Sequence, residues 1–95
     1  MKKTVYISGP ITGHRFYRVY FAIAEIKLRL QGYNIVNPAK VCAKLPRGLL
    51  HEQYMSICIP LLKLCDYIYV IGSEISKGME IELSKARINA LRIID

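Results

Sequence analysis

The loop after the first predicted strand carries residues that suit the binding of an anion. It reads Ser8-Gly9-Pro10-Ile11-Thr12-Gly13, and His14, Arg15 and Arg18 follow it closely. Glycines at such a turn allow the backbone to approach a phosphate, and the cations favour its charge. The segment is neither G-x-G-x-x-G nor a loop ending in Gly-Lys-Ser/Thr, so a P-loop is excluded. An ordinary turn explains the glycines equally well.

Two glutamates shortly after a second glycine-containing loop are the other candidates for chemistry. Glu80 and Glu82 follow Ser76-Lys77-Gly78, at the start of a helix predicted over 78–89. At ~100° per residue, an apolar stripe is predicted that consists of Met79, Leu83, Ala86 and Ala90. Glu82 lies roughly 70° from the centre of this stripe and Glu80 roughly 90° from it on the other side. Each is also explained as an ordinary N-terminal helix glutamate, which the macrodipole stabilises. The spacing alone favours that structural explanation.

The cysteines predict neither a metal site nor a disulfide framework. The chain has three cysteines, Cys42, Cys58 and Cys65, which is an odd number, and no two of them have C-x-x-C spacing. We therefore expect reduced thiols in a cytoplasmic protein, with no bound metal or cofactor. The N-terminus starts like a signal peptide, but its apolar run ends at Gly9-Pro10, short of the ~7–15 residues that such a segment needs. No apolar run reaches the ~18 residues of a membrane span, so no membrane partner is expected.

An alternating order of predicted strands and helices must position these candidates. β-Branched and aromatic runs predict strands over 4–8, 33–36, 67–71 and 91–94. Helical periodicity predicts helices over 17–31, 51–64 and 78–89. Gly32 should end the first helix, Pro60 should kink or divide the second, and residues 39–50 should form a loop. The order indicates one α/β domain spanning residues 1–95, a small three-layer Rossmann-like or flavodoxin-like fold with a parallel sheet of about four strands.

The expected fold also predicts where a ligand binds. In open parallel sheets, ligands bind beyond the carboxyl ends of the strands. Three predicted loops lie at that edge, namely 9–16, 37–50 and 72–78. The chemistry should therefore come from these loops and from the helix starts that follow them.

The charge and the apolar content predict partners. Fourteen Lys and Arg against seven Asp and Glu give a net charge of +7, which predicts an anionic partner. The basic residues are dispersed without a recognition motif, so nucleic acid is unlikely and a phosphate-sized ligand near Arg15, Arg18 and Lys77 is preferred. A hydrophobic content of 53% exceeds what one small core hides and predicts oligomer interfaces. Ile81 and Ile88 face away from the core stripe of their predicted helix and suggest contact with another subunit.

Four segments occur in an order that resembles a known family. They are 5–13 (Val-Tyr-Ile-Ser-Gly-Pro-Ile-Thr-Gly), 32–38 (Gly-Tyr-Asn-Ile-Val-Asn-Pro), 65–70 (Cys-Asp-Tyr-Ile-Tyr-Val), and Ser76-Lys77-Gly78 with Glu82 and Ala86. The set resembles the nucleoside 2-deoxyribosyltransferase superfamily, and most closely its short bacterial and phage branch known as DUF4406. The resemblance implies a Rossmann-like sheet, and homodimers or higher oligomers whose active sites are completed across subunits. It also implies chemistry at the N-glycosidic bond of nucleosides or nucleotides.

The resemblance further implies roles for particular residues. In the nucleotide N-hydrolase relatives an S-x-G-x-x-x-E segment carries the nucleophilic glutamate, and this position falls on Glu82 rather than Glu80. The implied mechanism is attack by Glu82 on C1′, after which water or a second base completes hydrolysis or transfer. The first glycine loop matches the segment that wraps the sugar and the 5′-phosphate. The residues thereby expected to bind substrate are Tyr6, Gly9, Ile11, Thr12, Gly13, Arg15, Ser76 and Gly78.

The chain departs from the hydrolase relatives at one position. They place an aspartate general acid twenty-four residues before the nucleophile, and counting back from Glu82 reaches Cys58. A thiol, with an ordinary pKa near ~8.5, is a poor replacement for a carboxylic acid. Glu52 or His51 could supply the acid instead. If neither does, we expect a sensor or sequestering protein that binds a nucleotide without turning it over.

Overall fold

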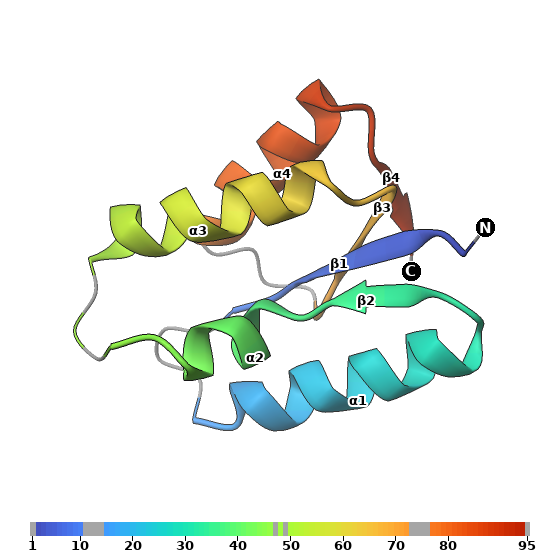
Figure 1. Ribbon diagram of the computed structural model, residues 1–95, viewed down its shortest axis with the longest axis horizontal. Coiled ribbons are helices and arrows are strands. Elements are labelled where there is room, and N and C mark those ends of the chain that lie inside the picture. The colour runs from blue at the N-terminus through green and yellow to red at the C-terminus, as the bar shows by residue number, and fades with distance from the viewer. Residues whose placement is uncertain (1, 11–14, 47, 49, 73–76, 95) are drawn as a thin grey trace.

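Strands and helices alternate along the chain, as the sequence predicts. The computed structural model describes residues 2–10, 15–46, 48, 50–72 and 77–94. The elements, shown in Figure 1, are β1 (Thr4–Ser8), α1 (Tyr17–Leu30), β2 (Asn34–Val36), α2 (Pro38–Ala43), α3 (His51–Lys63), β3 (Tyr67–Val70), α4 (Lys77–Ile88) and β4 (Arg92–Ile94).

The four strands form one parallel sheet in the order β2-β1-β3-β4. This confirms the predicted α/β class and the Rossmann-like or flavodoxin-like arrangement. The chain moves from β1 to β2 in one direction and then crosses back to place β3 on the other side of β1. The order therefore reverses between β1 and β3, and such a switch point opens a crevice at the carboxyl ends of the strands. Ser8 and Val70, which pair in register, stand at that point.

Two hydrophobic cores separate the three layers, and β1 contributes to both of them. Successive side chains of a strand point to opposite faces of the sheet. Val5 and Ile7 pack with the core residues of α1 and α2, whereas Tyr6 packs with those of α3 and α4. Figure 1 shows these layers, with α3 and α4 above the sheet and α1 and α2 below it. All five residues of β1 except Thr4 are buried, so its side chains are held rigidly on both faces.

The first helix ends as predicted, at a glycine. Gly32 has a φ of +93°, which favours glycine, and its amide donates a hydrogen bond to the carbonyl of Arg29. The amide of Tyr33 donates to the carbonyl of Leu28, so the last turn is satisfied before β2 begins. Glu25 and Arg29, four residues apart on α1, also form an ion pair, with 2.8 Å between Nε and Oε2.

The segment 39–50 is not entirely a loop, because residues Pro38–Ala43 form the short helix α2. The side-chain oxygen of Asn37 accepts a hydrogen bond from the amide of Ala39 at 3.0 Å, which caps the helix start. Pro38 stands at the first helical position, where its fixed φ suits a helix and its missing N–H is not needed. Asn37-Pro38 therefore follows the end of β2 and begins a helix that the prediction omitted.

Helices α3 and α4 refine two details of the prediction. Residues His51–Lys63 form one helix that contains Pro60, so of the two predicted alternatives the division into two pieces is wrong and the kink stays a prediction. The apolar stripe of α4 buries Met79, Leu83 and Ala86 as predicted. Ala90 does not belong to it, because α4 ends at Ile88 and Ala90 is exposed with a φ of +59°.

In the described part of the chain, no helix combines the length and the apolar character that a membrane span requires. The same residues contain no group of three or more His, Cys, Asp or Glu side chains placed to hold a metal ion.

Candidate active site

Glu82 of α4 is a buried carboxylate whose two oxygens both accept hydrogen bonds from β1. The residue is only 6% exposed, whereas Glu80 of the same helix is exposed. The Ser8 hydroxyl donates to Oε1 at 2.9 Å, and the Tyr6 hydroxyl donates to Oε2. Glu82 is therefore not a solvent-exposed glutamate at a helix start, as Glu80 is.

The strand geometry explains why these two hydroxyls reach one carboxylate. Tyr6 and Ser8 are two residues apart on β1, so they point to the same face of the sheet, the face covered by α3 and α4. Ser8 is the last residue of β1 and lies at the switch point between β1 and β3. The Glu82 carboxylate is thereby held at the carboxyl edge of the sheet, where a ligand is expected.

The Tyr6 hydroxyl keeps its proton in this setting. Burial raises the pKa of Tyr6 far above its ordinary value, and the negative charge of Glu82 and the nearby thiol of Cys58 raise it further. A phenol with such a raised pKa is a hydrogen-bond donor and not a source of protons. Tyr6 therefore orients Glu82 through its O–H group.

Cys58, on α3, completes this group of buried side chains. It is 3% exposed and packs in the same core cluster as Tyr6. The position at which the sequence resemblance expects an aspartate thus lies beside the Tyr6 hydroxyl, the group that donates to Glu82. Glu52, one of the alternative acids, is exposed in the first turn of α3, and the His51 side chain lies outside the described residues.

The structure describes only some of the other residues that are predicted to bind substrate. Ile11, Thr12, Gly13 and Ser76 lie outside the described residues, and Gly78 belongs to the first turn of α4. Arg15 is exposed, and its guanidinium carbon lies 5.6 Å from the centroid of the Phe16 ring. Their contact with a substrate stays a prediction.

Gly9 has a packing reason to be glycine. A Cβ atom there would lie 3.0 Å from the Phe21 ring and 3.1 Å from the Cβ of Ile71. The chain that leaves β1 therefore passes tightly between α1 and the end of β3. A side chain at this position would push the loop away from the carboxyl edge of the sheet.

A second buried carboxylate, Glu25, has a structural role. Its Oε1 accepts from Asn37 at 3.0 Å, and its Oε2 accepts from Arg29 at 2.8 Å and Lys40 at 3.0 Å. Burial alone would raise the pKa of Glu25, but these three hydrogen bonds outweigh it and lower the pKa to about 2. The ionised carboxylate joins α1 to the start of α2, so all its hydrogen-bonding capacity serves the fold.

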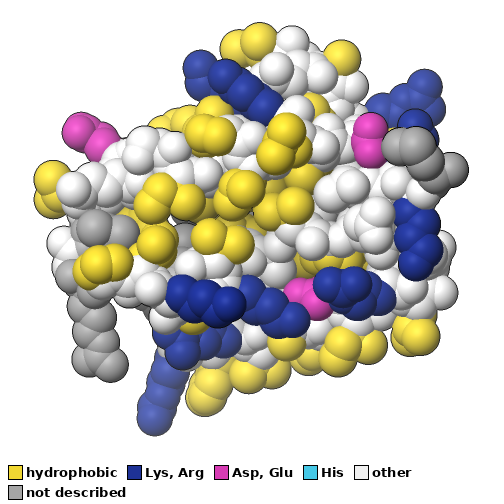
Figure 2. Space-filling view, in the orientation of Figure 1, with side chains coloured by type: hydrophobic (Ala, Val, Ile, Leu, Met, Phe, Trp, Pro, Cys, Tyr) yellow, Lys and Arg dark blue, Asp and Glu magenta, His cyan; other side chains and the backbone are white. Residues whose placement is uncertain are grey.

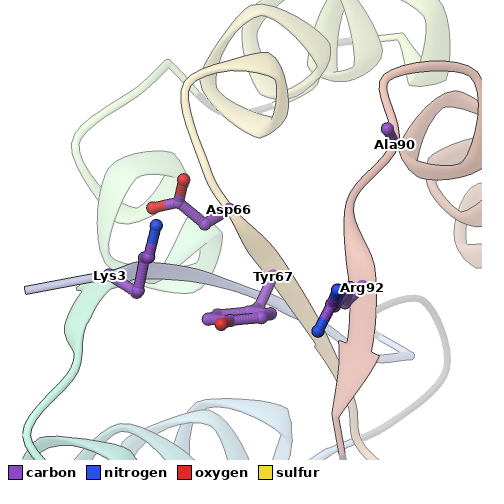
Figure 3. A pocket seen from close by; sticks show the side chains of 5 residues that line it. All are labelled: Lys3, Asp66, Tyr67, Ala90 and Arg92. Atoms are coloured by element: carbon purple, nitrogen blue, oxygen red, sulfur yellow. The ribbon is translucent and has the colours of Figure 1, made fainter.

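A polar hollow lies at the opposite edge of the sheet from Glu82. It has a volume of about 350 Å³ and opens at the amino ends of the strands (Figure 3). Its lining residues are Lys3, Asp66, Tyr67, Ala90 and Arg92. Ligands of parallel sheets bind at the carboxyl edge, so this hollow is separate from the candidate active site.

Ser8 is the residue of this group that the sequence reasoning missed as a site residue. Tyr6 was expected to contact the substrate, yet its hydroxyl is directed at Glu82. The alternation of side chains along a strand was the available signal, because it places residues 6 and 8 on one face. The sequence pattern does not show which face of the sheet α4 covers, so it does not show that Ser8 would meet Glu82.

Comparisons with known proteins identify the family of the chain and a solved structure with the same fold. Residues 3–95 match the family described as "Domain of unknown function (DUF4406)". No curated protein matches the sequence. Among solved structures, a 2-deoxyribosyltransferase from the psychrotolerant bacterium Bacillus psychrosaccharolyticus superposes with a TM-score of 0.74 at 18% identity. The match covers 95% of this chain and 69% of that one, and it shows that the two share a fold.

Proposed function

The chain belongs to the DUF4406 family of domains of unknown function, and we propose that it cleaves or transfers at the N-glycosidic bond of a nucleoside or nucleoside 5′-monophosphate. The observation that carries the proposal is the Glu82 carboxylate, buried at the carboxyl edge of the sheet and oriented by Tyr6 and Ser8. The shared fold with a 2-deoxyribosyltransferase supports the same class of chemistry.

In the proposed reaction Glu82 is the nucleophile. One carboxylate oxygen forms a bond to C1′ while the bond from C1′ to the base nitrogen breaks and its electron pair leaves with the base. Water then attacks C1′ and releases the sugar and the carboxylate, or a second base takes the sugar in a transfer. The hydroxyls of Tyr6 and Ser8 hold the carboxylate in one orientation, which favours in-line attack. No metal or cofactor enters this scheme.

The departing base needs a proton, and the described part of the site does not favour a strong donor. The raised pKa of Tyr6 makes it a poor acid, and Cys58 occupies the place where the resemblance expects an aspartate. A base that leaves as an anion, or one protonated by solvent, is compatible with the scheme. These observations also favour a second candidate, a protein that binds a nucleotide at this site without turnover.

The test is to incubate the protein with a panel of nucleosides and 5′-monophosphates and to measure free base by chromatography. Glu82→Gln should lower the rate of base release about 1,000-fold or more, because it removes the nucleophile. Glu80→Gln is the matched control, because it makes the same change at an exposed glutamate of the same helix. This substitution should leave the rate of base release unchanged. Equal rates in Glu82→Gln and wild type would refute the proposed role.

Calorimetry with the same panel separates the two candidate functions. Binding without base release over a long incubation indicates the non-catalytic protein. In that case Cys58→Asp, which supplies the expected acid beside Tyr6, should produce turnover. Circular dichroism of this variant is the necessary control, because a carboxylate replaces a buried thiol.

A further inference from the structure

Helix α1 carries a second apolar face, directed away from the sheet. Its core face buries Phe21, Ala24 and Leu28 against β1. Its outward face is a stripe of six large hydrophobic side chains, each between 52% and 84% exposed: Phe16, Val19, Tyr20, Ile23, Ile26 and Leu30. Figure 2 shows hydrophobic side chains along the lower edge of the molecule, where Figure 1 places α1. A surface helix normally presents polar residues on its outward face. A helix that is apolar on both faces is therefore expected to pack against a second partner as well as against its own sheet.

The spacing of this stripe is symmetric about Ile23. Phe16 and Leu30 each lie seven residues from Ile23, and Tyr20 and Ile26 each lie three residues from it. The alternating steps of three and four residues are those of a helix seam that packs on a second helix. If two α1 helices pack antiparallel with Ile23 at the centre, Phe16 meets Leu30, Tyr20 meets Ile26 and Ile23 meets its own copy. A two-fold interface requires this self-complementarity, whereas a lipid surface or an unrelated partner does not.

The cations of α1 do not oppose such a pairing, because each is held by a partner in its own subunit. Arg18 donates to the Tyr17 hydroxyl at 3.1 Å, and its guanidinium carbon lies 5.7 Å from the centroid of that ring. The Lys27 ammonium lies 5.1 Å from the centroid of Tyr69. Arg29 is paired with Glu25, as described above.

Val19, the remaining residue of the stripe, would face Lys27 of the second copy, the one polar side chain that lies opposite a stripe residue. Since the ammonium is turned toward Tyr69 in its own subunit, Lys27 offers its methylene stem to that contact.

The stripe is also large enough to form a specific dimer interface. If each half-exposed side chain offers on the order of 100 Å², the stripe presents on the order of 600 Å² per subunit, the upper end for the largest apolar patch on a monomer. Two copies would bury about 1,200 Å², which exceeds the ~1,000 Å² that a specific interface needs. We propose that the protein forms a two-fold dimer in which α1 packs antiparallel against α1 of a second copy, with Ile23 on the axis. This interface is independent of the proposed chemistry.

Sedimentation of the wild type should give a particle of about twice the 10.9 kDa chain mass, or a larger assembly that contains this pair. Ile23→Asp places two carboxylates against each other on the axis and should weaken the dimer about 100-fold or more, because opposed like charges cost several kcal/mol. Ile88→Asp is the matched control, since Ile88 of α4 is equally apolar and 73% exposed but lies outside the stripe. It should leave the dimer intact.

A cross-linking experiment tests the register and does not depend on a loss of association. Ile23→Cys, in a background with Cys42→Ser, should form an intermolecular disulfide with itself on mild oxidation, because the two copies of residue 23 meet at the axis. Leu64→Cys, at an exposed position after α3, should not form one at the same concentration. A mixture of Tyr20→Cys and Ile26→Cys chains should cross-link with each other more readily than either does alone.

Several results would overturn the proposal. The first is a monomeric wild type at tens of micromolar concentration that yields no Ile23→Cys disulfide. The second is an oligomer that Ile88→Asp dissociates and Ile23→Asp does not, which would place the interface on α4. The third is a monomer that sediments with vesicles of anionic phospholipid and loses this binding in Ile23→Asp, which would make the stripe a lipid-binding face.

Discussion

The hydrogen bond from the Tyr6 hydroxyl to Glu82 should be measurable as a coupling energy in the unfolding of the protein. Tyr6→Phe removes the hydroxyl and keeps the ring that packs between β1 and α3. Glu82→Gln removes the charge and keeps the shape of the side chain. If the two groups interact as the structure shows, the two substitutions together should cost less stability than the sum of their separate costs.

The magnitude follows from the burial of both partners. A hydrogen bond to a charged group contributes about 1.5–3 kcal/mol, and one between neutral groups contributes about 0.5–1.5 kcal/mol. Tyr6→Phe should therefore lower the free energy of unfolding by about 1.5–3 kcal/mol in the wild type. In the Glu82→Gln background the loss should be smaller, so the expected coupling energy is about 1–2 kcal/mol.

Urea unfolding followed by far-ultraviolet circular dichroism is the suitable assay, because the chain has no tryptophan and Tyr6→Phe alters the tyrosine fluorescence. The parallel cycle of Tyr6→Phe with Glu80→Gln is the control, and its effects should be additive because Glu80 is exposed. A coupling between Tyr6 and Glu82 smaller than about 0.5 kcal/mol, the usual error of additivity, would refute the inferred contact.

Three further predictions concern buried residues of the fold. Because the pKa of Glu25 is lowered to about 2, its stabilising effect is complete above about pH 5 and is lost as the pH falls toward 2, so acid titration of stability should show wild type and Glu25→Gln converging at low pH. Gly9→Ala should lower the free energy of unfolding by about 1–3 kcal/mol through contact with Phe21 and Ile71, and an unchanged urea midpoint would contradict the tight packing. Burial, with the nearby Asp66 charge, raises the pKa of Cys65 to about 11, so its alkylation in the folded protein should be slow at neutral pH and rise as the pH approaches 11; rapid labelling at pH 7 would argue against this burial.

Much of the fold follows from local sequence patterns. The strand at 4–8 is a short apolar β-branched and aromatic run, and Gly32 ends α1 because only glycine readily takes a positive φ. The helix α2 was missed because its signals, Asn37 as a cap and Pro38 at the first position, are also those of a turn. In the folded protein the Asn37 side chain also donates a hydrogen bond to Glu25 of α1, a contact that the local sequence does not show.

The sequence by itself determined the alternating α/β order, the parallel sheet and the edge at which a site should lie, because these follow from periodicity and from the rules of strand connection. Only the tertiary structure decided which glutamate of α4 is buried. Glu80 and Glu82 lie at similar angles from the core stripe, and the difference came from the position of α4 over the face of β1 that carries Tyr6 and Ser8. The tertiary structure likewise left the outward face of α1 without a covering layer, since the sheet can bury only one side of a helix.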